Sequence, residues 1–415
     1  MNLFTFLGAR KYTETTYLWR GETYTTSFAP IASCHFFKPD SVTVFLTTEA
    51  RKNTLEAFLA ELPAEIPVDE VDIPIGQNET ELWQIFSAIT KQAQSNSEIA
   101  FDITLGLRSF PLLSILVAAY LKAGLKIKLR GLFYGAFDAP DEANRTPIFD
   151  ISPMLALLDW ASAANRFDRT GDARYLAELL EEEKNNLGRA LSQKGQKNLG
   201  ELSKLNNLAG ALTDISQSLR LIRPHQAMER IATLPTRIEE AQKALDLAPA
   251  ALPFRLLLDD IAQSYRPLAQ KEPLAEENIG ETLRVEREMI GWYLEREHWV
   301  QAVSLAREWL VSWVMVHLKI HTITDLSERR GVERVVNTEA HKYLEKENAE
   351  FSSVFLSDIP HLEDILSLWL SLTDARNDID HAGMREDAKE PKNLIKNIKK
   401  YIVTLNELPL MVNTL

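Results

Sequence analysis

Three side chains near the end of the chain have types and a spacing suited to phosphodiester chemistry. The stretch LTDARNDIDH contains Arg376, Asn377 and His381. On a helix, Asn377 and His381 share one face because they are four residues apart, and Arg376 is long enough to reach that face from its flank. A histidine can take the proton of an RNA 2′-hydroxyl while an arginine stabilises the charge that gathers on the phosphate. Asn377 would orient the reacting groups, and no metal is required.

The same spacing also has an ordinary structural interpretation. Arg376 and Asp380 are four residues apart, so a salt bridge on a solvated helix face would account for the arginine. Arg220 and His225 are five residues apart, as Arg376 and His381 are, but Pro224 breaks the helical register between Arg220 and His225. From the residues alone, the catalytic and the salt-bridge interpretations both stay open.

A second group of candidate residues follows two apolar runs early in the chain. Gly8 lets the backbone turn closely past a bound group, and the second run passes through Gly106 towards Ser109. If a helix begins there, its free N–H groups face an anion, with Arg108 nearby to pair with it. Ser109 is equally an ordinary helix N-cap. Neither G-x-G-x-x-G nor a Walker lysine motif is present, so ordinary dinucleotide or triphosphate binding is not supported.

The elements that must position these residues differ between the two halves of the chain. In the first 150 or so residues, short β-rich runs alternate with helical stretches, which predicts an α/β fold with a doubly wound parallel sheet. The predicted strands are 3–7, 42–47, 71–75, 99–104 and 127–133. The predicted helices between them are 81–94 and 111–123.

From Pro153 onward, leucine, alanine, glutamate and lysine dominate and helical periodicity predicts an all-α half. Six prolines from Pro224 to Pro273 predict a middle region of shorter helices, whereas 281–318 and 361–373 are longer and rich in tryptophan. We therefore expect an α/β domain at 1–153, a helical middle region at 154–275 and a helical C-terminal domain at 276–415.

Composition narrows the class of protein. The only cysteine, Cys34, excludes an internal disulfide and a cysteine-based zinc site, which indicates a reducing cytoplasm. The first residues do not resemble a signal peptide, and no apolar run is long enough to cross a bilayer. The formal net charge of −13 disfavours a broad nucleic-acid-binding surface, so positive charge must be local. Late lysines offer some of it: Lys392, Lys396, Lys399 and Lys400.

The N-terminal segments resemble the ligand-binding pattern of CARF domains, the sensors of type III CRISPR-associated defence. The resemblance rests on the loop 6–12 and on the segment 102–111, DITLGLRSFP; the stretch 147–153 with Asp159-Trp160 is similar to the way these domains lead into their helical region. The family often has a histidine where this chain has Leu105. The resemblance implies a homodimer that binds a cyclic oligoadenylate, with cyclic tetra-adenylate expected ahead of cyclic hexa-adenylate. The implied ligand contacts are Gly8, Ala9, Arg10, Thr104, Gly106, Arg108 and Ser109.

Arg376-Asn377 followed by His381 matches the R-N-x-x-x-H signature of HEPN ribonucleases, and the motif lies late in an all-helical region as in that family. HEPN sites are formed between two protomers, so the resemblance implies a homodimer or a higher homo-oligomer. The two resemblances together imply a cyclic-oligoadenylate-activated endoribonuclease of antiviral defence that uses neither metal nor cofactor. It would cleave single-stranded RNA in the cytoplasm and leave a 2′,3′-cyclic phosphate.

Two other interpretations stay open. In the first, the protein is a non-catalytic sensor whose helical half is a protein-interaction or transcription-control module. In the second, the first domain degrades its own ligand by backbone placement and Thr104 or Arg10. Glu308, on a neighbouring predicted helix, either packs there or supports the candidate active site.

Overall fold

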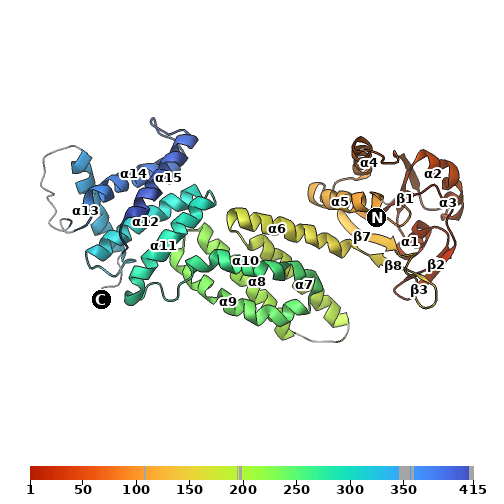
Figure 1. Ribbon diagram of the computed structural model, residues 1–415, viewed down its shortest axis with the longest axis horizontal. Helices are drawn as coiled ribbons and strands as arrows, with labels where there is room; N and C mark the ends of the chain where they lie inside the picture. The colour runs from red at the N-terminus through yellow and green to blue at the C-terminus, as the bar shows by residue number, and fades with distance from the viewer. Residues whose placement is uncertain (107–108, 194, 196–198, 345–355, 357–358, 411–415) are drawn as a thin grey trace. The chain divides into compact units, whose positions relative to one another are not determined.

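The computed structural model describes residues 1–106, 109–193, 195, 199–344, 356 and 359–410 (Figure 1). The chain divides into two compact units, Met1–Asp159 and Trp160–Leu415. A sheet with helices is followed by helices alone, which confirms the predicted α/β plus all-α fold class. The further division of the helical half near residue 275 stays a prediction.

The first unit is built on an eight-stranded sheet in the order β3-β2-β8-β7-β6-β1-β4-β5. Its parallel core consists of β1 (Asn2–Leu7), β4 (Ser41–Leu46), β5 (Val68–Asp72), β6 (Glu98–Asp102) and β7 (Lys128–Gly135). β1 pairs with both β4 and β6. From β1, the next parallel strands, β4 and β5, extend the sheet on one side, and β6 and β7 then extend it on the other, so the strand order reverses between β1 and β6. In doubly wound sheets, ligands bind beyond the carboxyl ends of the strands at such a reversal.

Three further strands, which the sequence analysis did not predict, extend the sheet beyond β7. They are β8 (Thr146–Asp150), β2 (Thr15–Trp19) and β3 (Glu22–Thr26). The sequences of β2 and β3, TTYLW and ETYTT, lack the apolar runs on which the prediction relied. The predicted strand 71–75 is displaced: β5 starts at Val68 and ends before Pro74, which has no N–H to donate to the ladder.

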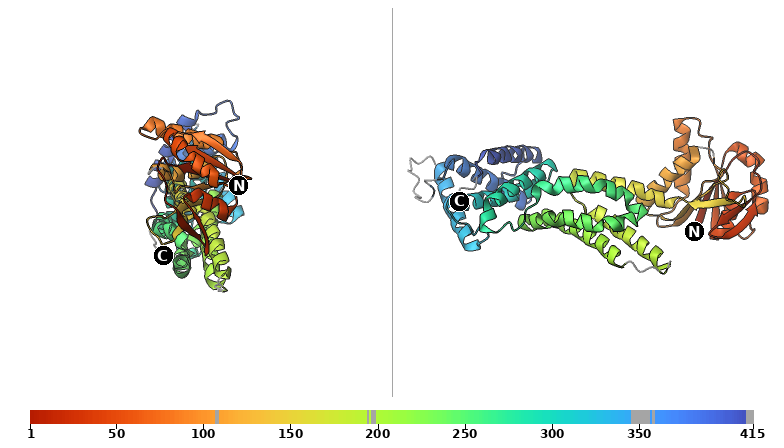
Figure 2. Two further views of the ribbon diagram at one scale, coloured as in Figure 1. Left: turned by 90° about the vertical axis from the view of Figure 1, so that its right-hand side faces the viewer. Right: turned by 60° about the horizontal axis from the view of Figure 1, so that its bottom comes forward.

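Helices cover both faces of the sheet, as a doubly wound fold requires (Figures 1 and 2). Side chains alternate along β1, so Leu3 packs into one core and Phe4 into the other. The face of Leu3 is covered by α1 (Ala29–Phe37), α2 (Thr48–Asn53) and α3 (Leu55–Glu61). The face of Phe4 is covered by α4 (Glu79–Gln92) and α5 (Ser109–Gly124).

The rest of the chain is helical, and its α-helices fall into an earlier and a later group. The earlier helices are α6 (Ala156–Thr170), α7 (Arg174–Gln193), α8 (Leu199–Arg220), α9 (Pro224–Asp246) and α10 (Leu252–Tyr265). The later ones are α11 (Ile279–Glu295), α12 (Trp299–His317), α13 (Leu326–Leu344), α14 (Leu362–Asp380) and α15 (Pro391–Glu407). No helix in the described part of the chain has the length and apolar character that a bilayer-spanning segment needs.

The expectation of shorter middle helices is wrong. Helices α7, α8 and α9 have 20, 22 and 23 residues, whereas α12 and α14 have 19 each. Figure 2 shows α7, α8 and α9 running side by side. Pro224 stands in the first turn of α9, where its missing N–H costs no hydrogen bond. Pro235 lies inside α9, where a proline costs about 3 kcal/mol. Burial of Met228, Ile231 and Leu234 on the same helix offsets that cost.

Candidate functional site

The three catalytic candidates lie at the C-terminal end of α14. The His381 N–H donates to the carbonyl oxygen of Asn377 at 3.0 Å, so the two residues are one helical turn apart. His381 is the first residue beyond the helix, and the side chains of both residues are exposed. No hydrogen bond joins the side chains of Arg376, Asn377 and His381, all three of which the structure describes. Asn377 and His381 are therefore accessible to a substrate from solvent.

A tight turn fixes the backbone on the far side of His381. The Gly383 N–H donates to the Asp378 carbonyl and the Ala382 N–H to the Ile379 carbonyl, each at 2.9 Å. This pair of hydrogen bonds is the Schellman pattern, in which the residue after the C-cap adopts a left-handed conformation and is usually glycine. Here that residue is Ala382, with φ of 53°. His381 thus sits between the last helical turn and a hydrogen-bonded reversal of the chain.

The loop that follows this turn is tied back to α14 by two aspartates. Asp378 is buried and accepts the backbone N–H of Lys389 at 3.0 Å. Asp374 accepts a hydrogen bond from the Arg385 guanidinium at 2.9 Å and also pairs with the Lys389 ammonium. Burial would raise the pKa of Asp374, but hydrogen bonds from Lys389 and Arg385 outweigh burial and lower this pKa. The backbone that borders His381 is therefore anchored at several points.

Arg376 is paired with acidic groups on two helices. Its Nε lies 3.2 Å from Oδ2 of Asp380, and one terminal nitrogen lies 3.5 Å from Oε1 of Glu308 on α12. Glu308 also pairs with Arg307 and Arg329, each at 2.8 Å. The salt bridge that the sequence spacing allowed is thus present, and Glu308 lies beside the candidate site. These two carboxylates compete with a phosphate for the Arg376 guanidinium.

The loop after β1, which carries Gly8, meets the loop after β6, which carries Gly106, where the strand order reverses. The Gly8 N–H donates to the Tyr12 hydroxyl at 2.6 Å, and this hydroxyl donates to the Leu105 carbonyl at 3.4 Å. A Cβ at Gly8 would lie 2.8 Å from the Tyr12 hydroxyl, and one at Gly106 would lie 3.0 Å from Cβ of Phe110. Both positions leave little room for a side chain, and the predicted loops do come together.

The other predicted ligand contacts are spread along the same two loops. Arg10 is exposed, and the carbonyl of Ala9 accepts the Asn53 side-chain amide at 3.2 Å. The Thr104 hydroxyl oxygen accepts the Gly135 N–H at 2.9 Å, so it joins this loop to β7.

Two contacts remain at the start of α5. Ser109 is the first residue of α5, and its role as an N-cap stays a prediction. Arg108 lies outside the described residues, as does Leu107.

Sequence reasoning missed Asp102 at the end of β6. This carboxylate is 1% exposed and accepts the Ser33 hydroxyl at 2.5 Å and the Thr104 N–H at 3.0 Å. Burial raises the pKa of Asp102 although both hydrogen bonds favour its ionised form. The available signal was one acidic residue that closes the apolar run IAF. Asp102 fixes the first residues of the loop that carries Thr104 and Gly106.

The comparisons with known proteins concern the middle helices. Residues 156–269, from α6 to the short helix after α10, match the family model described as CRISPR-associated protein MJ1674, second domain. CRISPR-associated protein MJ1674 of Methanocaldococcus jannaschii is 27% identical to this chain over 124 residues. That alignment covers 29% of the chain and 20% of the relative, so the chain spans about a fifth of the relative's length. The matched family segment contains neither the sheet nor α14.

Proposed function

We propose that this protein is a cyclic-oligoadenylate-activated, metal-independent endoribonuclease that acts in CRISPR-associated defence. The observation that carries the proposal is the exposure of Asn377 and His381 one turn apart, beside Arg376, at the anchored end of α14. The similarity of residues 156–269 to part of a CRISPR-associated protein supports the biological setting. The resemblance of the two ends of the chain to CARF sensors and HEPN ribonucleases suggests the activator and the reaction.

In the proposed reaction, His381 takes the proton of a 2′-hydroxyl in single-stranded RNA. The oxygen attacks the neighbouring phosphorus, the bond to the 5′-oxygen breaks, and the products are a 2′,3′-cyclic phosphate and a 5′-hydroxyl. Arg376 stabilises the charge on the phosphoryl oxygens and Asn377 orients the phosphate. A second copy of the chain would supply another His381 to protonate the leaving oxygen, which is why the proposed enzyme is a homodimer or a higher homo-oligomer.

An exposed apolar stripe on α5 supports the homodimer. Leu112, Leu116 and Tyr120 are 69%, 59% and 55% exposed, and they recur every fourth residue along one face of the helix. A contiguous exposed apolar stripe of this kind marks a site at which another protein surface binds. It is continuous with Ser109 at the proposed ligand edge, so we propose that a second copy covers it. Leu116→Glu should then convert the dimer to a monomer, measured by light scattering.

The test is cleavage of a fluorescent single-stranded RNA, with a chelator present, as cyclic tetra-adenylate and then cyclic hexa-adenylate are added. We expect one of the two rings to activate cleavage. His381→Ala should lose cleavage and keep ligand binding, and the matched control His341→Ala, at an exposed position of α13, should keep both. Asp380→Asn, which removes one of the two salt-bridge partners of Arg376 and leaves Arg376 itself in place, should keep cleavage. Silence of the parent protein with both rings would refute the proposal.

The pairing of Arg376 with Asp380 and Glu308 favours a second candidate, a non-catalytic sensor whose helical half is a protein-interaction or transcription-control module. On this interpretation Arg376→Ala and Asp380→Asn lower stability by similar amounts, and neither the parent protein nor any variant cleaves RNA. A sensor unit that degrades its own ligand is tested separately. Linear products from cyclic oligoadenylate incubated with His381→Ala protein would reveal it.

A further inference from the structure

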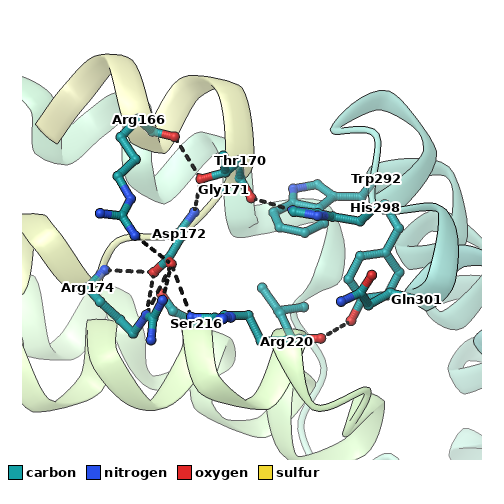
Figure 3. A pocket seen from close by; sticks show the side chains of 12 residues that line it. Arg166, Thr170, Gly171, Asp172, Arg174, Ser216, Arg220, Trp292, His298 and Gln301 are labelled. Atoms are coloured by element: carbon teal, nitrogen blue, oxygen red, sulfur yellow. Dashed lines mark hydrogen bonds and ion pairs between the residues drawn. The ribbon is translucent and has the colours of Figure 1, made fainter. Parts of the chain in front are cut away.

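A cavity of about 270 Å³ lies inside the helical unit, where α6, α7 and α8 approach α11 and α12 (Figure 3). Three of its lining residues are arginines, Arg166, Arg174 and Arg220, one from each of the first three helices. Among the residues that the structure describes, Asp172 is the one acidic side chain that lines the cavity. Three guanidinium groups against one carboxylate leave an excess of two positive charges, within a chain whose formal net charge is −13.

The turn that carries Asp172 is held rigidly. Gly171 has φ of 63°, and a Cβ at this position would lie 2.1 Å from Cζ2 of Trp292. The Gly171 carbonyl accepts the Tyr265 hydroxyl at 2.7 Å, and Nε2 of His298 lies 2.8 Å from the Thr170 carbonyl oxygen. The wall of the cavity is therefore built before any ligand arrives, as a specific binding site requires.

The three arginines bind Asp172 in different ways. Arg174 makes a bidentate pair, with Nε 2.9 Å and one terminal nitrogen 2.6 Å from the carboxylate oxygens. Arg166 and Arg220 converge on the same carboxylate but stay 3.7 and 3.8 Å away. Neither guanidinium donates a hydrogen bond to any residue that the structure describes. Arg174 thus neutralises Asp172, and the donors of Arg166 and Arg220 remain available to another anion.

The start of α12 lies at the opposite wall of the cavity, where it contributes His298 and Gln301. His298 is the N-cap residue of α12, its side chain makes no capping hydrogen bond, and Gln301 of the first turn lines the cavity. The first N–H groups of a helix lack intrahelical acceptors and carry partial positive charge. Free guanidinium donors that face an uncapped helix terminus form the donor set that a phosphate group prefers.

We propose that this cavity binds a small phosphate-bearing molecule through Arg166, Arg220 and the first turn of α12. The volume lies just below the range usual for drug-sized ligands, so the occupant is of the size of a phosphate with one small organic group, not a polynucleotide. Inorganic phosphate and a nucleoside monophosphate share this chemistry. The site lies entirely in the helical unit and does not depend on the proposed ribonuclease activity.

The test is calorimetric titration of the full chain with inorganic phosphate and, separately, with AMP, with adenosine as the uncharged comparison. We expect a phosphate compound to bind and adenosine not to bind. The double variant R166Q/R220Q should weaken binding by roughly tenfold or more, because two charge-assisted donor groups are lost. The matched control R237Q/R255Q removes the same charge from exposed positions on α9 and α10 and should bind as the parent does.

Binding of inorganic phosphate would identify the phosphate itself as the recognised group, and binding of AMP alone would show that the nucleoside is needed too. Absence of binding up to about 10 mM, or equal weakening in both double variants, would overturn the proposal. If R166Q/R220Q does not fold, the rise in unfolding temperature that phosphate causes is measured in the parent and in R237Q/R255Q. The two rises should be equal. No RNA is present, so the result is independent of whether the protein cleaves RNA.

Discussion

Replacing Gly171 by alanine should destabilise the helical unit by about 1–5 kcal/mol. The left-handed φ of 63° costs a residue with a Cβ roughly 1–2 kcal/mol. The new Cβ would also lie 2.1 and 2.3 Å from Cζ2 and Cη2 of Trp292, and overpacking of this kind costs about 1–3 kcal/mol. Restriction of the unfolded chain by alanine acts in the other direction and is worth about 0.4–1 kcal/mol. Steric and backbone strain therefore dominate.

Gly210→Ala is the matched control. Gly210 lies inside α8, and a Cβ there would meet nothing within 4 Å, so alanine should stabilise the helix by about 0.5–1 kcal/mol. Urea unfolding followed by tryptophan fluorescence reports mainly on this unit, because six of the eight tryptophans belong to it. The two variants should shift the midpoint in opposite directions. A midpoint for Gly171→Ala at or above that of the parent would show that the turn does not adopt this conformation in solution.

Three further predictions concern stability and reactivity. Ala382→Gly should raise the free energy of unfolding by about 0.5–1 kcal/mol, because glycine tolerates φ of 53°; an unchanged urea midpoint would count against the turn after α14. Burial opposes ionisation of Asp374, but Lys389 and Arg385 lower its pKa, so its stabilising effect is complete above the ordinary value of 3.8 and is lost as the pH falls further. In the Asp374→Asn variant, the free energy of unfolding should therefore fall less steeply than in the parent as the pH drops below 3.8. The same pH dependence in both proteins would contradict this. Burial raises the pKa of Cys34 to about 12, so a thiol reagent at about pH 8 should label it only after unfolding; rapid labelling of the folded protein would disprove that environment.

The central parallel strands β1, β4 and β6 could be predicted because each is buried on two faces and therefore has an apolar sequence. Both sets of side chains on β1, such as Leu3 and Phe4, are fully buried. The hairpin of β2 and β3 could not be predicted in this way, because most of its residues are half-buried or exposed and its sequence is rich in threonine. The prediction that a helix would end near Pro235 failed for a different reason. Helix propensity is a local property of the sequence, whereas the packing that keeps α9 continuous depends on other parts of the chain.

The candidate site shows the same limit. The separation of Asn377 and His381 by one turn follows from helix geometry and was predictable. The contact of Arg376 with Glu308 depends on how α12 packs against α14, which the sequence does not state. The arginine-lined cavity was missed for the same reason. Its arginines lie on three helices: the turn at Gly171 joins the helices of Arg166 and Arg174, and the packing of α8 against α7 adds Arg220.

Charge balance separates the two proposed sites. Around Arg376, the ion pairs join three cationic and three anionic side chains: Arg307, Arg329, Arg376, Glu308, Glu333 and Asp380. This cluster is neutral, so one copy of the chain offers a phosphodiester no net attraction there. The cavity beside Asp172 keeps an excess of two positive charges within a single copy. The proposed cleavage of RNA also needs a second copy to supply the other His381, whereas binding of a phosphate in the cavity needs only one copy. A monomeric variant should lose cleavage and keep phosphate binding, and loss of both would show that the two properties share one site.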